Sequence, residues 1–136
     1  MLDKMGCTFH HLGVACRNIE VEAKVWNAFG YVAEGPDFDD PVQRINGRFL
    51  IGPGPRLEIL APTTPDSPVE GILARGTKIY HQAFTVPRLD EAVAAARANR
   101  CKLMVGPVPA VAFEGRPIAF LLMPNMNLLE FIGEKI

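Results

Sequence analysis

The two halves of this chain contain strand-like and helix-like segments in the same order. The first half opens with a strand-like stretch at residues 8–17 and a helix-like stretch at 18–30, followed by three strand-like runs, YVAEG, VQRINGRFLIG and RLEILAP. The second half opens with KIYHQAFTV and the helix-like LDEAVAAARANR, followed by KLMVGPVPAVA, GRPIAFLLMP and NLLEFIGE. This repeat predicts an α+β fold built from two tandem βαβββ modules.

The boundaries of the two modules follow from the same pattern. We expect residues 1–136 to form a single domain, with residues 8–62 as the first module and 78–134 as the second. Residues 63–77 between them are rich in proline and read as a linker with a short helix. Ser67 precedes a proline and is the expected N-cap of that helix, so it is a poor candidate for a hydrolase nucleophile.

The helix at 18–30 has recognisable start and stop signals. Asn18 is the expected N-cap and Gly30 the expected stop. Its larger apolar residues recur at helical spacing, namely Val21, Val25, Trp26 and Phe29.

Composition narrows the class of function. The net charge of -1 and the pI near 6.3 leave no basic surface for a phosphate backbone, so we expect no nucleic-acid partner. No apolar run approaches the length of a membrane span, and the first residues lack the apolar core of a secretory signal. Three cysteines without a C-x-x-C pair indicate neither a disulfide framework nor a cysteine zinc site. We therefore expect a cytoplasmic protein without a membrane partner.

Four polar residues occupy equivalent positions in the repeat. His11 and His81 each lie inside the first apolar strand of a half, and Glu58 and Glu130 each lie inside the last, in LEIL and LEFI. The glutamate follows the histidine by 47 positions in the first half and by 49 in the second. Side chains alternate along a strand, so small residues share a face with each histidine and leave room beside it.

A divalent metal ion would explain this constellation. A charged glutamate inside a buried strand costs several kcal/mol unless it is paired or bound to a metal. Two imidazoles and two carboxylates, with positions left for water or substrate, suit Co, Mn, Ni, Fe or Mg better than tetrahedral Zn. The alternative is that the histidines are satisfied core residues and the glutamates face solvent on edge strands.

Other polar residues are weaker candidates. His10 lies on the opposite strand face from His11 and is expected to be structural. Four basic residues could contact an anionic substrate tail, although solvated surface charges are the ordinary case: Arg44, Arg48, Lys78 and Arg116.

The chain resembles the vicinal oxygen chelate superfamily, which includes glyoxalase I, dioxygenases and resistance proteins. Within it the similarity is greatest to the methylmalonyl-CoA epimerases, through HHLGVA, LEILAP, DSPVEGIL, YHQAFTV and LLEFI. The resemblance implies paired βαβββ modules that curl into a mixed sheet around a metal ion. It also implies that the metal ligands are the four residues His11, Glu58, His81 and Glu130.

Three departures from the epimerase pattern bear on the substrate. The usual G-[LM]-H-H is replaced by Lys78-Ile79-Tyr80-His81, and the usual His-Pro-Lys by Met123-Pro124-Asn125. Bacterial epimerases are thought to use a further glutamate on the third strand, whereas residues 42–52 contain no carboxylate.

The resemblance implies a metal-dependent isomerase of the methylmalonyl-CoA epimerase type. Such an enzyme removes the α-proton of a chelating acyl thioester or similar acid through a metal-stabilised enolate, with Glu58 and Glu130 as the catalytic carboxylates. The substrate would be a small molecule, such as an acyl-CoA, and the protein a homodimer. Two alternatives are a glyoxalase I-like lyase, which shares the ligand set, and a small-molecule binding or resistance protein without catalysis.

Overall fold

The computed structural model describes residues 1–134. The chain forms two compact units. We call His11–Tyr80 the first unit, and Met1–His10 together with the residues from His81 onward the second unit. A strand that crosses a boundary is described with the unit that contains most of its residues.

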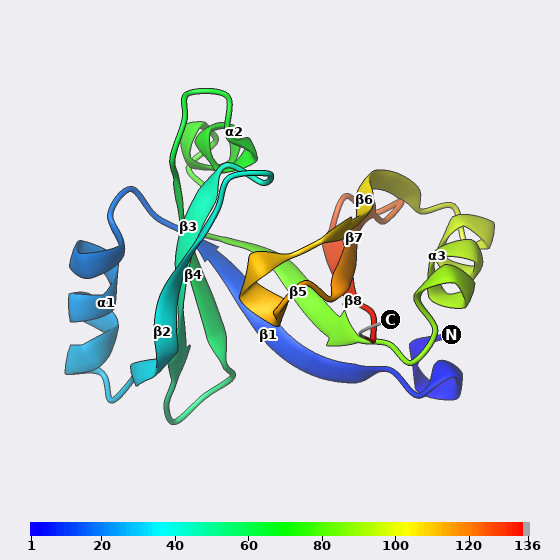
Figure 1. The fold of residues 1–136 in the computed structure, drawn as a ribbon, viewed down its shortest axis with the longest axis horizontal. Coiled ribbons are helices and arrows are strands. Elements are labelled where there is room, and N and C mark those ends of the chain that lie inside the picture. The colour runs from blue at the N-terminus through cyan, green and yellow to red at the C-terminus, as the bar shows by residue number, and fades with distance from the viewer. Residues whose placement is uncertain (135–136) are drawn as a thin grey trace. The chain divides into compact units, whose positions relative to one another are not determined.

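The first unit contains a mixed four-stranded sheet in the order β2-β3-β4-β1 (Figure 1). The first strand is parallel to the last, and the other two pairings are antiparallel. Its elements are β1 (Thr8–Ala15), α1 (Ile19–Ala28), β2 (Val32–Asp40), β3 (Ile45–Ile51), β4 (Leu57–Pro62) and α2 (Pro68–Ala74).

The second unit repeats this arrangement in the order β5-β8-β7-β6. Again the first strand is parallel to the last, and the others pair antiparallel. Its elements are β5 (Ile79–Thr85), α3 (Leu89–Ala98), β6 (Lys102–Pro109), β7 (Pro117–Leu122), β8 (Leu128–Ile132) and two 3₁₀ turns, η1 (Leu2–Met5) and η2 (Val111–Phe113). The predicted α+β class with two βαβββ modules is confirmed.

One face of each sheet packs against a helix. In the first unit Val14, Leu50 and Ile59 are almost completely buried under α1. In the second unit α3 contributes Ala92 and Ala96 to the corresponding core. Because side chains alternate along a strand, the residues between these core positions point to the other face of each sheet.

The helical spacing at 18–30 predicted α1 correctly, and Asn18 is its N-cap, where the side chain accepts a hydrogen bond from the Val21 amide at 3.0 Å. The buried face, however, is formed by Ala23, with Ile19 and Trp26 packed beside it. The other apolar residues of the predicted spacing are exposed: Val21, Val25 and Phe29. The small Ala23 permits close approach of the helix to the sheet.

The outer strand of each unit is longer or more irregular than the sequence suggests. The run YVAEG predicted a strand that stops at Gly35, but β2 continues to Asp40 through a register shift between Glu34 and Phe38. In the second unit β6 has a corresponding shift between Val105 and Val108. Both bulges contain a Gly-Pro step, which a strand accommodates only at the edge of a sheet.

Candidate metal centre

The first unit holds a buried histidine–glutamate pair. His11 Nε2 lies 3.2 Å from Glu58 Oε1, and the two side chains are 0% and 6% exposed. The parallel register of β1 and β4 places Gly13 beside Glu58. Gly13 has no side chain, and by the alternation of side chains it shares a face with His11.

The second unit holds the equivalent pair. His81 Nε2 lies 3.3 Å from Glu130 Oε1, with side chains 0% and 4% exposed. Here the parallel register of β5 and β8 places Ala83 beside Glu130. In both units, therefore, the glutamate lies next to the small residue two positions after the histidine.

Both glutamates lie on interior strands of their sheets. Strand β4 runs between β3 and β1, and β8 runs between β7 and β5. The whole residues Glu58 and Glu130 are 4% and 3% exposed. The alternative of solvent-facing glutamates on edge strands is therefore wrong.

The two pairs fit the donor chemistry of a divalent ion. Each of the four residues is buried and offers one atom, an imidazole nitrogen or a carboxylate oxygen, of the kind that such ions bind. Burying an ionised carboxylate is costly, and a cation beside it would offset that cost.

Sequence reasoning missed an aromatic residue beside each pair. The rings of Phe49 and His11 are 5.5 Å apart at 75°, and those of Phe120 and His81 are 5.2 Å apart at 83°. Both phenylalanines lie inside apolar strands, where an aromatic residue is ordinarily read as core. Their equivalent places in the repeat were the one signal that could have revealed them.

His10 and the three cysteines have surroundings different from those of the two histidine–glutamate pairs. His10 packs edge-to-face on Phe113 at 5.4 Å. The three cysteines are free thiols.

All four basic candidates interact within the protein. Arg44 pairs with Asp66 at 2.9 Å, Lys78 with Glu22 at 2.5 Å, and Arg116 donates to the Gly133 carbonyl at 2.6 Å. Arg48 binds Asp37 and Glu20. Its hydrogen bond holds the pKa of Asp37 below the usual value.

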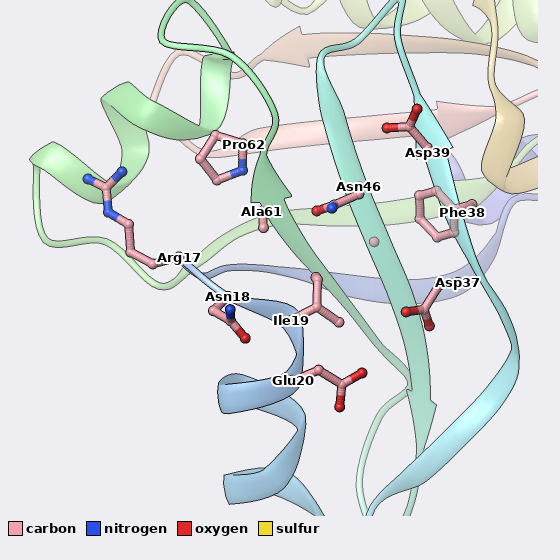
Figure 2. Close-up of a pocket in the computed structure, with 11 residues that line it drawn as sticks. Arg17, Asn18, Ile19, Glu20, Asp37, Phe38, Asp39, Asn46, Ala61 and Pro62 are labelled. Atoms are coloured by element: carbon pink, nitrogen blue, oxygen red, sulfur yellow. The ribbon is translucent and has the colours of Figure 1, made fainter.

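A cleft of about 510 Å³ opens in the first unit where the start of α1 faces β2 and β3 (Figure 2). Its lining includes Asn18 and Glu20 from the α1 side and Asp37 and Asp39 from β2. Neither His11 nor Glu58 lines it. The cleft is thus separate from the buried pair of this unit.

Within residues 1–134, no helix has both the length and the apolar character needed to cross a membrane.

Known proteins with similar sequences or structures include methylmalonyl-CoA epimerases. The mitochondrial methylmalonyl-CoA epimerase of Dictyostelium discoideum is 26% identical over 125 residues, which cover 87% of this chain and 72% of the relative. A hypothetical protein from Bacillus halodurans C-125 has a TM-score of 0.80 and 26% identity over 96% of both chains.

A variant of Streptomyces coelicolor methylmalonyl-CoA epimerase, solved with 2-nitronate-propionyl-CoA, has a TM-score of 0.76. At 22% identity over 94% of this chain and 97% of that one, it is similar in fold. A family model matches residues 10–120, which is most of the chain. The protein therefore belongs to the Glyoxalase/Bleomycin resistance protein/Dioxygenase superfamily.

Proposed function

We propose that the protein is a metal-dependent isomerase of the methylmalonyl-CoA epimerase type. The observation that carries the proposal is the duplicated, buried pair of one histidine and one glutamate in each unit. The epimerase relatives support it, because the similarity extends over most of the chain.

Both pairs would bind one divalent ion, with His11, Glu58, His81 and Glu130 as its protein ligands. The two carboxylates would balance the charge of the ion, and the two imidazoles would complete the protein's share of the coordination. When bound, the ion supplies Lewis-acid stabilisation of the negative charge that develops on a substrate carbonyl oxygen.

Glu58 and Glu130 would carry the proton. Inverting a carbon centre requires removal of a proton from one face and its return to the other, which a proton-carrying group on each face achieves. One carboxylate from each module supplies such a pair, each beside an imidazole nitrogen of its own unit. The four side chains are at most 6% exposed, and burial of this kind strengthens the electrostatic effect of each carboxylate.

We propose an acyl-CoA or another acyl thioester as the substrate class, because the relatives' names indicate CoA thioesters. Residues 42–52, which include β3, contain no carboxylate. Proton transfer would therefore depend on the two glutamates of the pairs. A homodimer stays a prediction, which sedimentation analysis would test.

Metal content and proton exchange test this proposal together. We expect protein purified without added metal to contain about one divalent ion per chain by elemental analysis, and His81→Ala and Glu130→Gln to lose most of it. His10→Ala is the matched control and should retain the ion, because His10 contacts Phe113. Unchanged metal content in both ligand variants would refute the ligand set.

The activity itself is measured as solvent deuterium incorporation into methylmalonyl-CoA. We expect exchange by the metal-loaded protein. In Glu58→Gln and Glu130→Gln reloaded with excess metal, we expect exchange to be slowed roughly 100-fold or more, the scale of general acid–base catalysis. Turnover of a glutathione hemithioacetal instead would identify a glyoxalase I-like lyase, which shares the donor set. Neither reaction, with a small molecule still bound, would identify a binding protein.

A further inference from the structure

Phe49 and Phe120 occupy equivalent positions relative to the two glutamates. Phe49 is the direct partner of Glu58 in the antiparallel register of β3 and β4. Phe120 is the direct partner of Glu130 in the register of β7 and β8. Residues directly opposite each other on antiparallel strands project to the same face, so each phenylalanine shares a sheet face with one glutamate.

Each phenylalanine also contacts the histidine of the same pair. Both contacts are edge-to-face, with ring centroids 5.5 Å apart for His11 and 5.2 Å apart for His81. In this arrangement a quarter turn of the imidazole about its χ2 bond would break the edge-to-face geometry, which is a preferred geometry for aromatic rings. The rotation that it opposes would carry Nε2 away from the carboxylate 3.2 to 3.3 Å distant.

The two phenylalanines are distinct from the helix-covered cores. Both are only half-buried. By contrast, Phe131 is 0% exposed and packs in the core under α3. Alternation along β8 points Phe131 away from the face of its neighbour Glu130.

Resting on the proposed metal-dependent function, we infer that Phe49 and Phe120 are positioning residues that hold His11 and His81 in the orientation in which Nε2 faces the glutamate. An imidazole already held in that orientation loses less conformational freedom when an ion binds. The phenylalanines therefore increase the affinity of the protein for a divalent ion.

Cobalt binding tests the effect on affinity. Calorimetric titration with Co²⁺ alone should give a dissociation constant about 10-fold higher in Phe49→Leu and in Phe120→Leu, the lower end of the range for groups that orient metal ligands. Phe131→Leu is the matched control. It makes the same phenylalanine-to-leucine change in the second unit. It should lower the urea midpoint of unfolding while keeping the dissociation constant for Co²⁺ within about 2-fold of the wild-type value.

A second measurement needs no metal. In the metal-free protein, relaxation of the imidazole carbons measured by NMR should show that the His11 and His81 rings are rigid. The motion of the His11 ring should increase in Phe49→Leu, and that of the His81 ring in Phe120→Leu. His10 is the internal reference and should be unchanged.

The outcomes separate this inference from the proposed function. If the wild type binds no Co²⁺, the metal proposal fails, and the relaxation data alone decide whether the phenylalanines hold the imidazoles. Unaltered ring motion in both variants would overturn the inference. So would unaltered affinity in both variants of a protein that binds the ion.

Discussion

The Cys16 thiol is held in its neutral form by its position in the core under α1. The residue is 1% exposed. Burial, with a smaller effect from Glu22, raises the pKa of Cys16 to about 11. Roughly one thiol in a thousand would then be ionised at pH 8, and the thiolate is the reactive species.

We therefore expect iodoacetamide at pH 8 to leave Cys16 unmodified in the folded protein while it alkylates the half-buried Cys7 and Cys101. Mass spectrometry of the digested protein measures each site, and alkylation in guanidinium is the control that should modify all three. Modification of native Cys16 as fast as Cys101 would contradict this burial.

The Asp37 carboxylate gives a prediction about how the stability of the protein depends on pH. Its hydrogen bond from Arg48 lowers its pKa in the folded protein, so the ionised form is favoured by folding. This stabilisation is present above the unfolded pKa and disappears as the pH falls through the folded value. The Asp37 side chain is 53% exposed, so solvent screening limits the effect to about 1 kcal/mol or less.

Asp37→Asn should accordingly destabilise the protein more at pH 7 than at about pH 2, because the stabilisation from ionised Asp37 is lost as the pH falls through its lowered folded pKa. Urea unfolding of both proteins at the two pH values measures the difference. A destabilisation that is the same at both would show that the charge of Asp37 contributes nothing.

The sequence was sufficient to pair His11 with Glu58 and His81 with Glu130, because a charged residue inside an apolar strand stands out and the repeat shows it twice. It was insufficient for Phe49 and Phe120, because an aromatic residue in a strand is unremarkable. Their role depends on the register of neighbouring strands, which determines which residue lies opposite each glutamate.

At the scale of elements, α1 and α3 begin differently although they are equivalent in the repeat. The Asn18 side chain caps α1, whereas Arg88 at the start of α3 makes no side-chain capping hydrogen bond. Both residues have extended backbone, with φ of -145° and -132°. The α3 position could therefore accommodate a capping asparagine.

Asn18→Ala should lower the free energy of unfolding by about 1 kcal/mol, the usual effect of losing an N-cap. Arg88→Ala should change it much less, since it removes only an exposed ion pair with Glu91. Arg88→Asn should raise it, because the new side chain can accept a hydrogen bond from the first turn. Urea unfolding at pH 7 measures all three, and equal losses in the two alanine variants would contradict the assignment of Asn18 as the cap.

Element order was readable from sequence, but the extent of β2 was not. Gly35 and Pro36 resemble the end of a strand, since proline cannot donate to a ladder. Strand β2 continues past them because it is the outer strand of its unit and the bulge absorbs the interruption, with Gly35 at a φ of +75°. Whether a strand lies at the outside of a sheet depends on the tertiary structure. In the local sequence, the only sign of this position is the Gly-Pro step, which an outer strand tolerates.

At the scale of the whole molecule, the repeat of βαβββ units explains why the sequence specified the fold class well. Each unit has a parallel first and last strand with a histidine and a glutamate side by side. The order of elements and the positions of these two residues are weak signals in one half alone, and their recurrence in the other half supports both. The proposed ion would take ligands from both units, and its binding would then add to the stability of both.

Saturating Co²⁺ should therefore stabilise the entire chain. At a free concentration 100 times the dissociation constant, binding adds about 2.7 kcal/mol, which corresponds to a rise of roughly 10 °C in the melting temperature. Differential scanning calorimetry should show this rise in one transition, and EDTA should reverse it. The rise should vanish in His11→Ala and in His81→Ala alike, because an ion shared by the two units needs ligands from each. A rise that persists in either variant would mean that one unit binds the ion alone, and the shared centre would have to be abandoned.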